Sequence, residues 1–237
     1  MEELRLLGEC LKGLMRLNTF ATQNIQSTRA EGWTMQGFVQ SYLATGDESL
    51  KDYALRRVNE IVEPDRRKNH ASKAMTFQYN YPGTLFTPVG NHQFYMPWQH
   101  GAVLFGYLGA AEFFENSTCM QICEDVVHMV DHSWARNVNT QTWGLVGDGL
   151  RYYVPTASNG VPVLPDHFDL TPGIGPRFGD SPLGGAHTFL TSGLLLMEQR
   201  STDPTISTLA GTYGRMILGN VNNFNRWDKW NAVAPLY

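Results

Sequence analysis

Apolar residues recur with helical spacing between Trp33 and Pro64, on both sides of a short polar break. Before the break, they fall on one face of a 3.6-residue period: Met35, Phe38, Val39, Tyr42 and Leu43. After the break, a second stripe has the same spacing: Leu50, Ala54, Val58, Ile61 and Val62. Such a stripe lets an α-helix bury one face against a neighbour. We therefore expect two helices here, the second of which ends at Pro64.

The break, Thr45-Gly46-Asp47, combines a helix stop with a helix start. A glycine adopts the left-handed conformation of a helix C-cap without steric cost, and an aspartate accepts hydrogen bonds from the free N–H groups that open the next helix. A connection this short leaves the two helices antiparallel. The segment thus predicts a helical hairpin.

Two more helical hairpins and a leading helix show the same pattern. The leading stripe ends near Asn18, the second hairpin begins after Met96-Pro97-Trp98, and the third opens at Gly184. Each hairpin has one apolar face that only a neighbouring hairpin can cover. We therefore expect antiparallel pairs over residues 34–63, 99–134 and 186–219, whose first helices run parallel and pack side by side.

Other segments lack a helical stripe. The polar residues 19–29 are expected to form a loop, the charged run 64–69 to be solvated, and residues 79–83 to form a turn. The longest such segment, residues 143–183, is rich in Gly and Pro and cannot be a long helix. Within it, two short β-prone runs flank Ser158-Asn159-Gly160 and predict a short β-hairpin.

The pattern as a whole predicts an all-α fold: an array of α/α hairpins with one long irregular insertion. Irregular insertions of this length are uncommon in compact helical domains and are often functional. At 237 residues, the chain has room for one sizeable core, and we treat residues 1–237 as a single domain.

Composition excludes several classes of function. The net charge of -4 supplies no basic surface for nucleic acid. The longest apolar run, residues 101–114, contains Glu112 and is shorter than the roughly 20 residues that span a bilayer. No signal-peptide pattern follows Met1. We therefore expect a soluble protein that acts on neither nucleic acid nor membrane.

Sequence motifs give no sign of a cofactor. The chain has no Gly-rich phosphate loop, nucleophile elbow or zinc signature, so an NTPase, a serine hydrolase and a metalloprotease all lack support. Its three cysteines are too few for a disulfide scaffold, and we expect Cys119 and Cys123, which lie i, i+4 on an apolar helix face, to be buried thiols. No cofactor and no metal are expected.

The first hairpin resembles the repeating unit of α/α-toroid proteins of the six-hairpin glycosidase type. The resemblance lies in residues 32–58, GWTMQGFVQSYLATGDESLKDYALRRV, with its Tyr-Leu-x-Thr-Gly-Asp connection. It implies parallel inner helices and a substrate cleft built at one end of them. Three hairpins and a leading helix would make an incomplete toroid or part of a larger one. Its apolar edges would need a cover, so we expect a homo-oligomer.

If the first helix of each hairpin is the inner one, several aromatic and polar residues gather at the cleft end. The residues that we predict to bind substrate are Glu31, Trp33, His92, Trp98, Gln99, Tyr152 and Arg177. The residues that we predict to be catalytic are Asp148, Asp166, Asp169, Asp180, His100 and His187. Aromatic platforms with converging polar groups suit a carbohydrate ligand, whose rings have an apolar face and a polar rim.

Three functions are compatible with these residues. Glycoside hydrolysis requires one protonated carboxylic acid and a second carboxylate, which the aspartates and Glu31 would supply. A sugar epimerase or a uronate lyase requires a base and a cation, which His100, His187, Tyr152 and Arg177 would supply. A non-catalytic helical binding module or a fragment is the third. We take the glycoside hydrolase-like hypothesis as the leading one.

The same residues also have structural interpretations. Trp33 and Trp98 would anchor helix starts in the core, and His100 would be a hydrogen-bonded structural residue. The acidic run at residues 166–169 resembles a metal cluster in composition, but a capped turn fits its spacing better.

Overall fold

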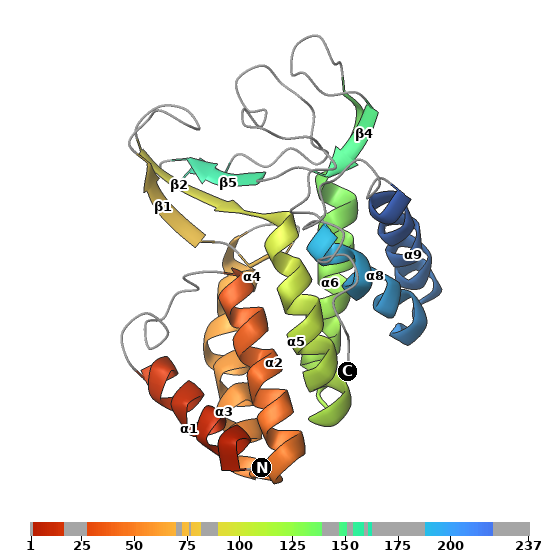
Figure 1. Cartoon of the computed structure of the whole chain (residues 1–237). Helices are drawn as coiled ribbons and strands as arrows, with labels where there is room; N and C mark the ends of the chain where they lie inside the picture. Colours follow the sequence, from red (N-terminus) through yellow and green to blue (C-terminus); the bar gives the residue numbers. More distant parts are fainter. Residues whose placement is uncertain are drawn as a thin grey trace.

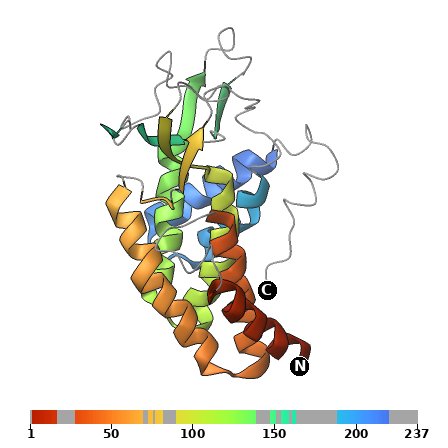
Figure 2. The ribbon, with the colours of Figure 1, turned by 90° about the vertical axis from the view of Figure 1, so that its left-hand side faces the viewer.

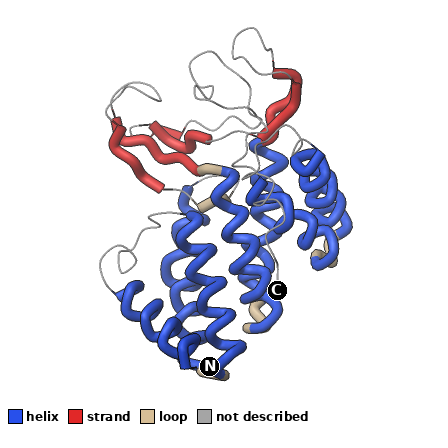
Figure 3. Tube along the Cα trace, viewed as in Figure 1, coloured by secondary structure: helices blue, strands red, loops and turns tan. Residues whose placement is uncertain are grey.

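The computed structural model describes residues 2–16, 28–69, 73–75, 77–81, 90–138, 147–150, 154–158, 161–162 and 188–219. Most of this part is helical, with short strands at one end (Figure 3). The α-helices are α1 (Glu2–Arg16), α2 (Thr28–Thr45), α3 (Glu48–Arg57), α4 (Glu63–Asn69), α5 (His100–Phe113), α6 (Ser117–Ser133), α8 (Thr188–Arg200) and α9 (Pro204–Gly219). The predicted all-α fold class is confirmed in part, because these residues are mainly helical but also form strands.

The three predicted hairpins are the pairs α2–α3, α5–α6 and α8–α9, and their connections are capped as the sequence indicates. Gly46 has a φ of 66°, and its N–H donates to the Tyr42 carbonyl at 2.7 Å. Asp47 Oδ1 then accepts from the Ser49 N–H at 2.9 Å. Asn116 and Asp203 cap α6 and α9 in the same way.

The prediction that Pro64 ends the second helix is wrong. The helix continues through a π-helical turn, η1 (Val58–Val62), into α4. The Glu63 N–H donates to the Val58 carbonyl, five residues back. A proline has no N–H and its ring crowds the carbonyl four residues earlier, and a wider turn before it relieves both problems.

The charged run after Pro64 is also less solvated than expected. Arg66 is buried, and its guanidinium binds Glu63 at 2.7 Å and Asp125 of α6 at 2.9 Å. Its Nη1 also donates to the Lys73 carbonyl at 2.9 Å. These bonds hold α4 against α6 through paired buried charges. The sequence alone does not show which charges will pair.

The first helices of the hairpins, α2, α5 and α8, lie side by side (Figures 1 and 2). Close backbone contacts show that α2 and α5 run parallel. Gly32 abuts the Ala102 carbonyl, and Gly106, one turn further along α5, abuts the Gly32 carbonyl and the Gln36 N–H. Contacts therefore advance along both helices in the same direction.

The contact between α5 and α8 has the same polarity. Gly101 abuts the Phe189 carbonyl, and a Cβ at Gly193 would lie 2.7 Å from Leu104 Cβ. As a result, α5 is central, and every residue from His100 to Ala110 is buried. The predicted parallel, side-by-side arrangement of the first helices is thus confirmed.

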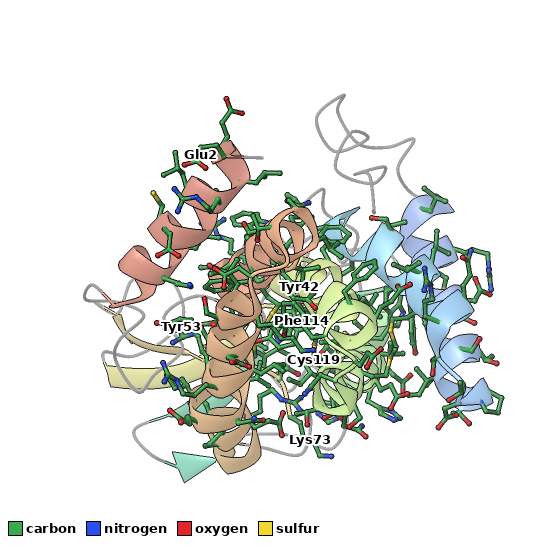
Figure 4. All side chains as sticks on the ribbon, turned by 90° about the horizontal axis from the view of Figure 1, so that it is seen from below. Glu2, Tyr42, Tyr53, Lys73, Phe114 and Cys119 are labelled. Atoms are coloured by element: carbon green, nitrogen blue, oxygen red, sulfur yellow. The ribbon has the colours of Figure 1, made fainter. Side chains whose placement is uncertain are left out.

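The remaining helices cover this row. Helix α6 packs behind α5, and α9 packs against α8 and α6. Helix α1 lies against α2 and α3, where Leu11 faces Gly37. From below, Tyr42 and Phe114 lie close together among the helices, whereas Glu2 lies at the outer end of α1 (Figure 4). The Tyr42 and Phe114 rings meet edge to face, with centroids 5.3 Å apart.

A small sheet lies over the end of the bundle at which α5 begins (Figure 1). Its strands have the order β1 (Phe77–Tyr81), β2 (Gly90–Tyr95), β5 (Val154–Ser158) and β6 (Val161–Pro162), all antiparallel. A separate pair is formed by β3 (Trp134–Val138) and β4 (Gly147–Leu150).

Two predictions concern these strands. The turn expected at residues 79–83 is wrong for residues 79–81, which pair with β2 because the aromatic residues there alternate as a strand requires. The pairing of Ser158 with Val161 lies where the short β-hairpin was predicted. Residues 82–83 and most of the segment 143–183 lie outside the described residues.

The described cysteines do not share one environment. Cys119 and Cys123 are fully buried thiols, as predicted, whereas Cys10 is exposed on α1. Burial raises the pKa of the Cys119 thiol to about 12. None of the described helices combines the length and the apolar character that crossing a membrane requires.

Candidate functional site

One cation and three aromatic rings meet where α2, α5 and α8 begin. Arg29 and Trp33 belong to the first two turns of α2, Trp98 to the 3-10 turn η2 (Pro97–Gln99), and Phe189 to the start of α8. The Arg29 Cζ atom lies 5.7 Å from the centre of the Trp33 ring and 5.6 Å from that of Trp98. The Trp98 and Phe189 ring centroids are 6.2 Å apart. We call these four residues the Arg29 cluster.

The members of the Arg29 cluster differ in exposure. Trp98 is only 9% exposed, so it packs beneath the others. This agrees with the alternative that Trp98 anchors a helix start in the core. Trp33 is 46% exposed, and Arg29 is exposed as well. The surface that a ligand can reach is therefore formed by the Trp33 indole and the Arg29 guanidinium.

Local backbone chemistry holds this surface in place. Pro97 fixes the start of η2, and the Gln99 N–H donates to the Met96 carbonyl at 3.0 Å. The buried Gln99 side chain accepts a hydrogen bond from the Arg29 N–H at 3.3 Å. Because the first N–H groups of a helix have no partner within it, this bond ties the start of α2 to the start of α5.

Glu31 lies in the same turn of α2 but points into the protein. Its carboxylate accepts two hydrogen bonds from the Arg57 guanidinium, one of 2.8 Å from Nε and one from Nη2. Both side chains are buried. Burial alone would lower the pKa of Arg57, but Glu31 raises it overall. The pair thus joins α2 to α3 as two ions, and Glu31 does not face the surface of the Arg29 cluster.

His100 is 1% exposed and has backbone partners at both ring nitrogens. Nε2 accepts from the Met75 N–H at 3.1 Å, so Nδ1 carries the proton and donates to the Met96 carbonyl at 3.0 Å. This is the arrangement of a structural histidine. A role as a catalytic base would require one of these two bonds to break.

The structure thus brings five of the sequence-predicted residues to one end of the bundle: Glu31, Trp33, Trp98, Gln99 and His100. For His92 on β2 and Asp148 on β4, it describes the backbone only. The other predicted residues lie outside the described part of the chain: Tyr152, Asp166, Asp169, Arg177, Asp180 and His187. Their roles stay predictions.

Sequence reasoning missed Arg29 because it assigned residues 19–29 to a loop. The helix in fact begins at Thr28, which places Arg29 one turn before Trp33. That i, i+4 spacing on a common helix face was the available signal. The position of Phe189 beside Trp98 had no local signal, since the two residues are 91 positions apart in the sequence.

A groove of about 510 Å³ lies far along the same helices, beside their C-terminal halves. Its lining is mainly apolar and comes from α5, α6 and α8: Leu108, Gly109, Ala111, Glu112, Phe113, Met120, Leu196 and Arg200. Arg200 and Glu112 form an exposed ion pair of 2.7 Å there. The groove therefore lacks the free polar groups that orient a sugar.

The chain matches no family model, no curated protein and no solved structure. Within the described ranges, no three side chains of the metal-binding types gather closely enough to hold an ion. The Arg29 cluster is the candidate site on the strength of its exposed indole and cation.

Proposed function

We propose that this chain is a carbohydrate-active, glycoside hydrolase-like domain that binds its ligand on the exposed face of the Arg29 cluster. The observation that carries the proposal is the half-exposed Trp33 indole on a helix locked into the bundle. An indole offers a rigid apolar face to the C–H face of a sugar ring. Arg29 beside it offers hydrogen-bond donors to the ring's polar rim.

The fold arrangement supports the same proposal. Parallel first helices are what the resemblance of residues 32–58 to six-hairpin glycosidases implies. We therefore propose that α2, α5 and α8 are the inner helices of an incomplete α/α toroid. The site at their N-terminal ends would then be the substrate cleft.

The proposed hydrolysis needs two carboxyl groups, and Glu31 is already bound by Arg57. We propose that the acid and the base come from Asp148, Asp166, Asp169 or Asp180. Each aspartate would be replaced by asparagine in turn. Two of the four variants should release sugar several orders of magnitude more slowly than the parent, and the other two should not. A separation of about 5–5.5 Å between the two carboxyl groups would give retention, and about 6.5–9.5 Å would give inversion.

A non-catalytic binding module is the second candidate. The observation in its favour is that Glu31 and His100, two candidate acid-base groups, both serve structural hydrogen bonds. This candidate predicts ligand binding by the same Trp33 face without any release of reducing ends. Product analysis after prolonged incubation with bound polysaccharides separates the two functions.

The direct test compares two substitutions on α2. Trp33 and Leu43 are 46% and 49% exposed, so Trp33→Ala and Leu43→Ala remove similarly exposed apolar side chains. We expect Trp33→Ala to weaken oligosaccharide binding about tenfold, which corresponds to about 1.4 kcal/mol. Leu43→Ala should leave affinity unchanged. Calorimetric titration that finds equal affinities for both variants and the parent would refute the proposed site.

The proposed arc also has exposed apolar residues at both edges. Leu4, Leu6 and Leu7 on α1 and Met216 and Leu218 on α9 are all more than a third exposed. We propose that a second copy covers part of this surface, because large uncovered apolar patches are rare on monomers. Light scattering at micromolar concentration should give a mass above that of one chain, and a monomeric mass would contradict the proposal.

A further inference from the structure

The guanidinium of Arg29 has no carboxylate partner among the described residues. By contrast, five other arginines lie within ion-pair distance of a carboxylate: Arg5, Arg57, Arg66, Arg200 and Arg215. The Arg29 guanidinium lies instead over the rings of Trp33 and Trp98. A cation above a ring face uses no N–H group for that contact, so the five donors of the guanidinium stay available.

In the part of the chain that the structure describes, no charge neutralises that of Arg29. The carboxylate closest in sequence, Glu31, is buried and bound by Arg57, so this pair contributes no net charge. The N-terminal ends of α2, α5 and α8 lie at the same end of the bundle, and each adds a partial positive charge. Among the described residues, this end is therefore locally positive, whereas the net charge of the chain is -4.

We propose that the sugar recognised by the Arg29 cluster is a uronic acid, a pyranose that carries a carboxylate. Its ring would lie on the exposed Trp33 indole, and its carboxylate would accept two parallel hydrogen bonds from Arg29. The planar fork of a guanidinium matches a carboxylate in this way, and the two indoles hold the fork in one orientation. This inference rests on the proposed function and names its substrate class.

The test compares acidic polymers with esters in which the carboxylate charge is removed. Polygalacturonate, alginate and glucuronan would each be compared with its methyl-esterified form in calorimetric titrations of the full chain. We expect at least one acidic polymer to bind tenfold or more tightly than its ester, with a preference that falls as salt is added. Arg29→Gln should lower the affinity for the acidic polymer to that for its ester. Arg29→Lys should retain only part of the preference, because a lysine keeps the charge but not the fork.

Arg56→Gln is the matched control. Arg56 is also exposed and lies over one ring, that of Tyr53, at 5.3 Å, but it belongs to α3. Its replacement should change neither affinity nor the preference for the acidic polymer. An equal loss in both variants would show a general charge effect and would overturn the proposal.

Two further outcomes separate this inference from the proposed function. Equal binding of acidic and esterified polymers, unaffected by Arg29→Gln, would overturn the uronic acid inference and leave carbohydrate binding intact. Binding of no glycan of either class, by a parent protein with a cooperative thermal transition, would overturn both. Thermal melts of every variant show that the fold is retained, and Arg29→Lys serves as the test if Arg29→Gln does not fold.

Discussion

A single methyl group added at Gly106 should force α2 and α5 apart. The Cβ of an alanine at this position would overlap the Gly32 carbonyl oxygen and would lie 2.9 Å from both the Gln36 nitrogen and Met35 Cβ. The obstacle is mostly backbone, so no side-chain rotation relieves it. Helix α5 cannot simply retreat, because it is buried from His100 to Ala110 with α8 on its other side.

The expected magnitude follows from two opposing terms. Overpacking of a closely packed interior typically costs about 1–3 kcal/mol, and a clash with backbone belongs at the upper end. Alanine is a better helix former than glycine by about 1 kcal/mol, which offsets part of that cost. We expect Gly106→Ala to lower the free energy of unfolding by about 2 kcal/mol. For a chain of this length, this corresponds to a fall in Tm of about 4–8 °C.

Gly13→Ala is the matched control. Gly13 is also helical, in α1, but nothing lies within 4 Å of the Cβ that it would gain. Only the difference in helix propensity between alanine and glycine remains, so the free energy of unfolding should stay the same or rise by about 1 kcal/mol. Urea titrations and thermal melts followed by circular dichroism give both values. If Gly106→Ala were as stable as Gly13→Ala, the close parallel contact of α2 with α5 would be refuted.

Four other predictions concern individual buried groups. Trp98→Ala should cost about 3–5 kcal/mol in unfolding free energy by urea titration, since its ring is buried; a near-neutral effect would show that it is a surface residue. Glu31→Gln should cost about 3–5 kcal/mol in thermal melts because it leaves the Arg57 charge buried and unpaired, and an unchanged Tm would contradict that burial. At pH 8, a thiol reagent should label the exposed Cys10 but not the folded Cys119, as read by mass spectrometry. Burial raises the pKa of the Cys119 thiol from 9.0, its value when exposed, to about 12 in the folded protein. The unfolded chain therefore loses this proton first, so the free energy of unfolding should be unaffected below pH 9 and fall between pH 9 and 12 by about 1.4 kcal/mol per pH unit.

Part of the candidate site followed from the sequence, and part did not. The placement of Trp33, Trp98 and Gln99 at the starts of successive first helices followed from helix boundaries, which depend on residues within a few positions. Which of the two indoles is exposed did not follow. Trp98 is covered by Phe189, a residue from the third hairpin, and no pattern around Trp98 encodes that contact.

The sequence by itself determined the hairpins. Apolar stripes at helical spacing and caps such as Gly46 and Asp47 act over one or two turns, so they can be read without any knowledge of the rest of the chain. The same holds for the parallel order of the first helices, because each hairpin returns the chain to the same end.

Only the tertiary structure decided the partners of the polar groups. Glu31 is a structural ion rather than a surface carboxylate because Arg57 lies opposite it, and His100 is held by the backbone of Met75 and Met96. The wide turn before Pro64 is likewise followed by a helix whose Arg66 binds Asp125 of another hairpin. The physical reason is common to all of them: helix signals are local in sequence, whereas burial and the pairing of charges depend on residues brought together from distant segments.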